Sequence, residues 1–155
     1  MDGYAQIISL SLAVTVVGIA VYTDARSRVI SNRLTLPAMI CGVLLQGLTR
    51  GPEGLVYALQ GAVLGLLVLL IPVLLGGMGA GDAKLLAAVG SLAGPGITGG
   101  TFFFSVLLAG GLGLWFYFAR GWRKGLPYAP CILLGLVITL VAVFAQRSGQ
   151  PWGLY

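Results

Sequence analysis

The sequence predicts an all-α protein: a polytopic membrane helix bundle with about six transmembrane helices. Hydrophobic residues make up 58% of the 155 residues, charged residues make up only 8%, and the mean hydropathy is +1.00. A soluble domain carries about 25% charged residues, so this composition is typical of an integral membrane protein. Six spanning helices of about 20 residues each occupy roughly 120 residues. We therefore expect residues 1–155 to form a single integral-membrane domain without a soluble domain.

The first three expected helices are separated by short polar or glycine-rich segments. The first helix covers residues 4–22 and is expected to be retained, because it lacks the basic start and the small-residue cleavage site of a signal peptide. A loop with three arginines at 24–33 leads to the second helix at 34–48. A turn rich in Gly and Pro at 49–54 leads to the third helix at 55–75.

The second half of the chain contains a shorter apolar segment. A glycine-rich turn at 76–81 precedes this fourth segment, which covers 82–93 and ends at Gly94-Pro95-Gly96. At about 18 Å, the fourth segment is shorter than the hydrocarbon core of a bilayer. It therefore either crosses the membrane like the other segments or forms a re-entrant segment that enters and leaves on the same side. The fifth helix at 99–119 and the sixth at 131–145 are separated by the most basic loop of the chain.

Basic residues predict how the bundle lies in the membrane. With six crossings, seven of the nine Lys and Arg residues fall on one side, and only Arg50 and Arg147 fall on the other. A re-entrant fourth segment changes this division to four against five, so the charge distribution favours six crossings. Because basic loops mark the cytoplasmic face, we expect both termini outside, in a cytoplasmic (inner) membrane. The net charge of +5 therefore indicates topology rather than nucleic-acid binding.

Acidic residues are rare in this chain, with only four among 155 residues. Asp82 ends the glycine-rich turn and opens a hydrophobic segment, and Asp24 follows the first helix. A carboxylate beside hydrocarbon is costly, so each acid is a candidate functional residue. The six-crossing topology places Asp24 and Asp82 at the same cytoplasmic face, and we predict that the fold brings them together.

Two neighbouring carboxyl groups support hydrolysis without any other catalytic group. In a low-dielectric site they share one proton, so one activates a water molecule while the other polarises a carbonyl and protonates the leaving amine. The chain contains no histidine, and we expect neither a metal nor a cofactor. The glycines around Gly79 and Gly81 are expected to permit positive φ and to leave room for an extended substrate strand.

Each of these residues also has a structural interpretation. Asp82 fits the N-cap of the fourth helix, and Asp24 fits a polar loop. Lys84 fits an interfacial lysine or a counter-ion of the acids. Asn32 is better explained as a turn or N-cap residue of the second helix than as a catalytic residue.

The two acidic segments resemble one known family. Gly79-Ala80-Gly81-Asp82 matches the GxGD signature of intramembrane aspartyl proteases, and the longer run 79–90 resembles the type IV prepilin peptidases. Asp24 followed by Ile30-Ser31-Asn32 resembles the first-aspartate segment of that family, where proline is usual in place of serine. Leu126-Pro127-Tyr128-Ala129-Pro130 resembles the entry to its last helix.

The resemblance implies a prepilin leader peptidase with Asp24 and Asp82 as the catalytic pair. Such enzymes cut the basic leader from the hydrophobic helix of type IV-like prepilins at the cytoplasmic face. The expected partners are therefore a prepilin and the lipid bilayer, with no nucleic acid. Residues expected to bind substrate or support the acids are Gly79, Gly81, Lys84 and Asn32.

Larger members of the family add a cysteine-rich zinc domain with N-methyltransferase activity. This chain has only two cysteines, Cys41 and Cys131, so we expect the short form without a methyltransferase domain. It looks similar to the peptidases of tight-adherence pilus systems and to archaeal relatives that process archaellins.

Two other classes of function compete with the peptidase. A small proton- or ion-relay subunit would use both acids as carriers, but such a path predicts acids at mid-depth, and the expected helices contain none. An assembly protein that binds pilin without cutting it would not depend on the ionisable state of Asp24 and Asp82.

Overall fold

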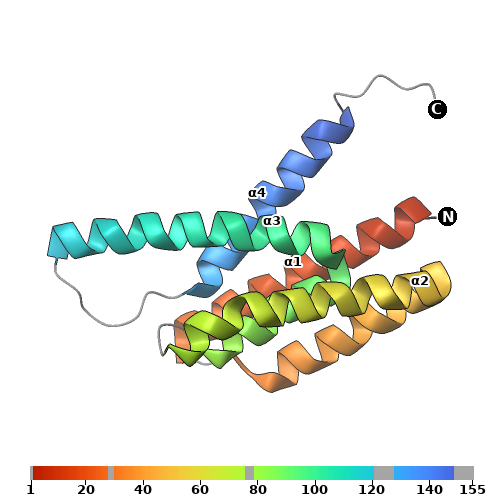
Figure 1. Ribbon diagram of the computed structural model, residues 1–155, viewed down its shortest axis with the longest axis horizontal. Helices are drawn as coiled ribbons and strands as arrows, with labels where there is room; N and C mark the ends of the chain where they lie inside the picture. The colour runs from red at the N-terminus through yellow and green to blue at the C-terminus, as the bar shows by residue number, and fades with distance from the viewer. Residues whose placement is uncertain (1, 28–29, 76–78, 121–127, 149–155) are drawn as a thin grey trace.

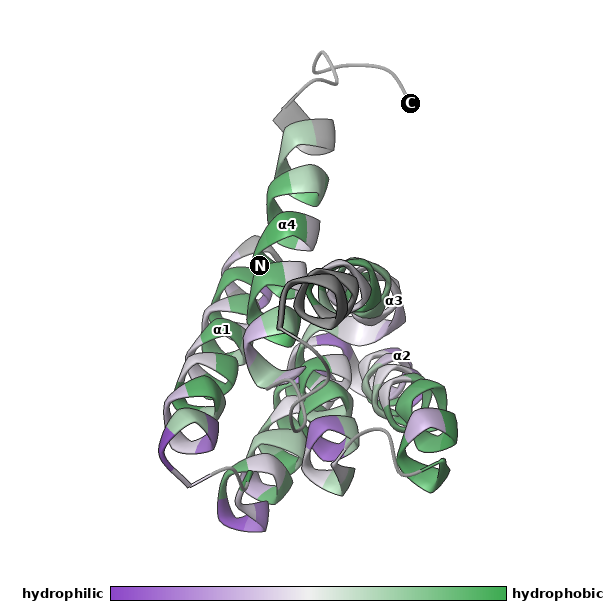
Figure 2. Cartoon of the chain, turned by 90° about the vertical axis from the view of Figure 1, so that its left-hand side faces the viewer, coloured by the Kyte–Doolittle hydropathy of each residue, from purple (hydrophilic) through white to green (hydrophobic). Residues whose placement is uncertain are grey.

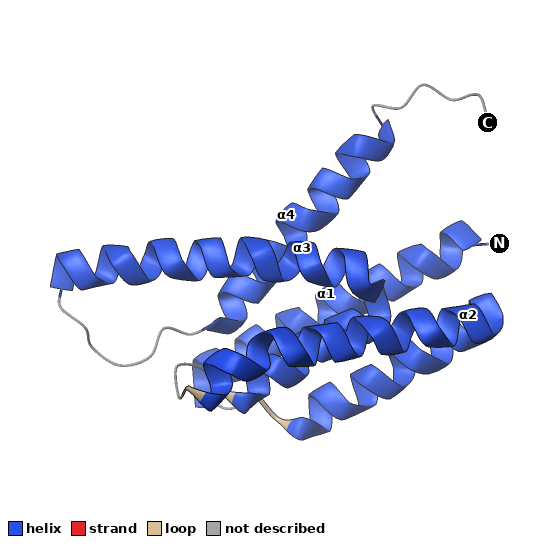
Figure 3. Cartoon of the chain, in the orientation of Figure 1, coloured by secondary structure: helices blue, strands red, loops and turns tan. Residues whose placement is uncertain are grey.

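The computed structural model describes residues 2–27, 30–75, 79–120 and 128–148. Within these residues the chain forms four helices and no strand (Figures 1 and 3): α1 (Asp2–Ser27), α2 (Asn32–Leu74), α3 (Ala80–Arg120) and α4 (Tyr128–Ser148). All four are long and apolar enough to cross a membrane. The all-helical membrane class is therefore confirmed. Residues 76–78 of the glycine-rich turn and 121–127 of the basic loop lie outside the described residues.

The described chain has four helices where six separate helices were expected, because α2 and α3 each join two expected segments. Each of these helices is broken at one glycine with a positive φ, Gly51 at 66° and Gly94 at 81°. Both glycines are followed by a proline, which lacks the N–H that a helix interior requires. Helices α2 and α3 reverse direction at these breaks (Figure 1).

The reversal of α2 brings its two halves into contact. A Cβ atom on Gly54 would lie 2.0 Å from the carbonyl oxygen of Gln46. A straight helix separates residues eight positions apart by about 12 Å along its axis. Gly54 therefore lies where the returning half of α2 passes directly over the first half.

Small residues also allow α2 and α3 to pack closely. A Cβ on Gly61 would lie 2.1 Å from the Gly90 carbonyl oxygen, and a Cβ on Gly65 would lie 2.5 Å from the Leu86 carbonyl oxygen. Glycine at such crossings allows two backbones to approach without side chains between them. The first half of α3 is consequently the centre of the bundle, and Leu85, Leu86 and Val89 are 0% exposed.

Side-chain hydrogen bonds stabilise the break in α3. The carbonyl oxygen of Leu92 accepts hydrogen bonds from Gln46 Nε2 at 2.8 Å and from Ser9 Oγ. Thr98 Oγ1 donates to the carbonyl oxygen of Gly94 at 2.7 Å. Because a break leaves carbonyl groups without helical donors, these contacts from α1, α2 and α3 satisfy groups that would otherwise be buried without partners.

The opposite end of the bundle contains the end of α1 and the starts of α2 and α3. Figure 2 looks toward this end and shows hydrophilic segments gathered there, while the flanks of the helices are hydrophobic. Helix α1 continues to Ser27, so Asp24 lies in its last turn rather than in a loop as expected. Ser31 is the N-cap of α2, with its Oγ accepting from Arg33 N at 3.2 Å. Interpreting Asn32 as the N-cap was therefore wrong.

Candidate active site

Asp24 and Asp82 come from different helices and meet at the hydrophilic end of the bundle. Asp24 lies in the last turn of α1, and Asp82 lies in the first turn of α3. Their carboxyl groups interact electrostatically, and both side chains are half-buried. The structure thus brings together the two acids that the sequence singled out.

The start of α3 fixes the Asp82 side chain. The backbone N–H of Asp82 donates to the Gly79 carbonyl oxygen at 3.1 Å, and the Asp82 carboxylate accepts from the backbone N–H of Gly79. This reciprocal pairing resembles a capping box, in which an acid at the third helical position reaches back to the cap. Asp82 is therefore not the N-cap itself. A carboxylate has about four acceptor positions, so this pairing leaves Asp82 free to make further contacts.

Gly81 is needed because the two acidic segments pack against each other at this point. A Cβ on Gly81 would lie 2.9 Å from the Cβ of Ile30, in the segment that follows Asp24. A Cβ on Gly79 would make only an ordinary contact, 3.5 Å from Asp82 Oδ2. Neither glycine has a positive φ, so the left-handed backbone that glycine permits is not used at these two positions, whereas the close approach is found at Gly81.

Lys84 and Asn32 form a second connection between the two segments. Lys84 Nζ donates to Asn32 Oδ1 at 2.9 Å, which links the start of α3 to the start of α2. Among the described residues, no salt bridge joins Lys84 to either acid. The amide of Asn32, rather than a carboxylate, is the partner that the structure gives to this lysine.

Two residues of α4, Tyr128 and Cys131, also lie beside Asp82, although the sequence did not single them out as site residues. Tyr128 is 5% exposed and Cys131 is 2% exposed, and both interact electrostatically with Asp82. Their position at the start of the last expected helix, just after Pro127 in the sequence, was the signal available. With six crossings that helix starts at the same face as the acids.

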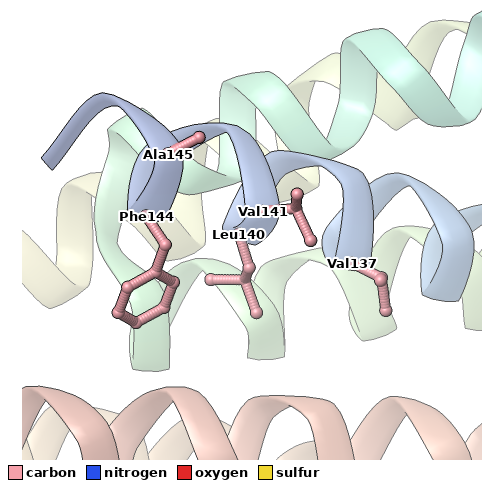
Figure 4. Close-up of a pocket in the computed structure, with 5 residues that line it drawn as sticks. All are labelled: Val137, Leu140, Val141, Phe144 and Ala145. Carbon is pink, nitrogen blue, oxygen red and sulfur yellow. The ribbon is translucent and has the colours of Figure 1, made fainter. Parts of the chain in front are cut away.

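Two surface grooves away from the acids are apolar. One lies along α4 and is drawn in Figure 4. Its lining consists of Val137, Leu140, Val141, Phe144 and Ala145. A second groove lies between α1 and α4 and shares Leu140 and Phe144 with the first. These grooves contain no ionisable side chain, so the chemistry of the described site comes from the residues around Asp24 and Asp82.

Comparison with known proteins identifies the class to which this fold and this acid pair belong. Residues 11–114 match the type IV leader peptidase family. The match includes more than half of the chain and contains both Asp24 and Asp82. The chain belongs to the type IV leader peptidase family.

A curated relative gives a more specific likeness. The chain is 32% identical over 145 residues to a protein of Bacillus subtilis (strain 168) described as prepilin leader peptidase/N-methyltransferase. The alignment covers 89% of this chain and 55% of that relative, so the chain spans about half of the relative's length. No solved structure matches the chain.

Proposed function

We propose that this protein is a prepilin leader peptidase, an aspartic endopeptidase that uses Asp24 and Asp82. Its substrate is a type IV-like prepilin, cut between the basic leader and the hydrophobic helix. The observation that carries the proposal is the electrostatic interaction between these two carboxyl groups, from α1 and α3, within the region matched by the family. The scarcity of other acids supports it, since only four are present in 155 residues.

The reaction requires one proton between the two carboxyl groups. The ionised carboxylate takes a proton from water while the water oxygen attacks the peptide carbonyl carbon. The protonated carboxyl gives its proton to the carbonyl oxygen, and a neutral gem-diol forms. One gem-diol hydroxyl then returns a proton to the second carboxyl, and the first carboxyl protonates the nitrogen as the C–N bond breaks. The products are a free carboxyl and a free amine, and the acids regain their starting state.

The neighbouring residues are proposed to hold this pair in place. Gly81 lets the Asp82 segment pack on Ile30, and the Gly79 backbone fixes the Asp82 carboxylate. The Lys84–Asn32 hydrogen bond ties the starts of α2 and α3 together. A displacement of about 1 Å in a catalytic geometry lowers a rate by roughly 10²-fold, so such contacts matter for turnover.

We further propose that α2 and α3 each cross the membrane twice, giving six crossings. A straight helix of 43 residues, the length of α2, would extend about 65 Å, more than twice the hydrocarbon core of about 30 Å. The reversals at Gly51 and Gly94 support this topology. Seven of the nine basic residues then lie on the side of Asp24 and Asp82, which puts the acids at the cytoplasmic face and both termini outside.

The proposal is tested by co-expressing the protein with a prepilin and measuring leader loss by intact mass. We expect Asp24→Asn and Asp82→Asn each to lower cleavage by at least about 10³-fold, because asparagine keeps the shape but transfers no proton. Glu53→Gln is the matched control, since Glu53 is an exposed acid on α2 close to the Gly51 break. It should cut like the wild type.

Two results would refute the proposal. If either aspartate variant cuts at close to the wild-type rate, that acid is structural and the two-carboxyl mechanism is wrong. If the wild type leaves several prepilins uncut, the protein is not a leader peptidase.

A further inference from the structure

Tyr128 carries a buried hydroxyl at the start of α4. Its side chain is 5% exposed, and its Oη has no hydrogen-bond partner among the described residues. Thr98 and Thr139 donate their buried hydroxyls to backbone carbonyl oxygens of their own helices, whereas two shorter side chains, Thr35 and Thr101, share the unpaired state of Tyr128 among the described residues. A buried donor without an acceptor is destabilising, so such a group is retained for a reason other than stability.

The position of this hydroxyl is held firmly. Tyr128 is the first residue of α4, and the residues that follow it, Ala129, Ile132 and Leu136, are 0% exposed. The first turns of α4 are therefore fixed against the core. A tyrosine at a membrane interface normally extends its hydroxyl into water, but this hydroxyl is covered by protein.

The surroundings of Tyr128 are those of the proposed active site. The phenol interacts electrostatically with the Asp82 carboxyl group and with the Cys131 thiol. It makes no hydrogen bond to either, so its proton remains available to a third group beside Asp82. In the proposed reaction, that third group is the substrate peptide.

We propose that Tyr128 is a catalytic residue whose hydroxyl donates a hydrogen bond to the carbonyl oxygen of the scissile peptide bond. This inference rests on the proposed peptidase function. Partial negative charge builds up on the carbonyl oxygen before the carboxyl proton has fully reached it, and a fixed donor in a site shielded from water stabilises that charge. Tyr128 keeps its proton throughout, so the proton transfers of the two aspartates are unchanged.

The test compares Tyr128→Phe with the wild type in prepilin cleavage and in thermal unfolding. Phenylalanine keeps the ring and removes only the hydroxyl. We expect kcat to fall by roughly 10²-fold, which is the effect of removing one hydrogen-bond donor from an oxyanion hole. KM should change little. We also expect the melting temperature to stay equal or to rise, because the lost hydroxyl has no partner within the part of the chain that the structure describes.

Tyr57→Phe is the matched control, because Tyr57 is half-buried beside the break at Gly94, away from the acids. It should leave kcat unchanged. The inference is overturned if Tyr128→Phe cuts at the wild-type rate. It is also overturned if this variant loses activity only together with a lowered melting temperature. In both cases the proposed peptidase function stands. If the wild type itself cuts no prepilin, the proposed function fails and this inference fails with it.

Discussion

The end of the bundle where α2 and α3 reverse direction differs from the end that carries Asp24 and Asp82 in how its polar groups are held. At the reversal end, Gln46, Ser9 and Thr98 supply hydrogen bonds to the carbonyl groups around the break in α3. At the acid end, two carboxyl groups repel each other and the Tyr128 hydroxyl is unpaired among the described residues.

This difference indicates a division of roles between the two ends. A satisfied buried network fixes a fold, whereas repelling or unpaired groups lower stability and persist where a reaction uses them. We therefore expect changes at the reversal end to affect stability first. Changes at the acid end should affect cleavage first.

The largest effect on stability is expected for Gly94→Ala. A Cβ there would lie 1.9 Å from the Tyr57 ring, and the backbone has a φ of 81°. Backbone strain and overpacking together should lower the free energy of unfolding by about 2–6 kcal/mol. The measurement is thermal unfolding in detergent, with Gly96→Ala as the control because a Cβ at Gly96 meets nothing within 4 Å. Equal melting temperatures for the two variants would contradict the account.

Gly81→Ala should have a smaller effect on stability and a clear effect on cleavage. The added Cβ would lie 2.9 Å from the Ile30 Cβ, so the two acidic segments must move apart at a cost of about 1–3 kcal/mol. Cleavage should fall by at least about tenfold, because the carboxyl groups lose their alignment. Gly79→Ala, where the new contact is an ordinary 3.5 Å, should be milder in both assays. Larger effects of Gly79→Ala than of Gly81→Ala would show that the Ile30 contact does not set the alignment of the two carboxyl groups.

The smallest effect is expected at the Lys84–Asn32 hydrogen bond. Because both side chains are partly in solvent, a double-mutant cycle with Lys84→Met and Asn32→Ala should give a coupling energy of about 1 kcal/mol. Additive effects of the two substitutions would mean that the bond contributes nothing to the fold.

Composition was sufficient to predict the all-helical membrane class. The apolar content predicted membrane helices. The Gly-Pro pairs at Gly51 and Gly94 predicted turns, and the chain turns at both positions. Asp24 and Asp82 stood out because so few acids are present. Helices α2 and α3 are each interrupted by non-helical backbone at these turns, at Gly51 and at Gly94.

Contacts between distant segments were not predictable. The approach of Gly81 to Ile30 and the position of Tyr128 beside Asp82 depend on how α1, α3 and α4 pack, and a pairwise contact leaves no periodic pattern in one sequence. Asn32 was interpreted as a turn or N-cap residue, but the N-cap is its neighbour Ser31, and both residue types are good caps. Only the hydrogen bond from Arg33 N distinguishes them.

The most direct test of the account is to measure stability and cleavage together for Asp82→Asn. Asparagine removes the repulsion from Asp24, and its amide oxygen can still accept from the Gly79 N–H. We predict that the melting temperature is unchanged or higher while the prepilin leader stays attached. A lowered melting temperature with cleavage retained would show that Asp82 stabilises the fold and does not act in the reaction.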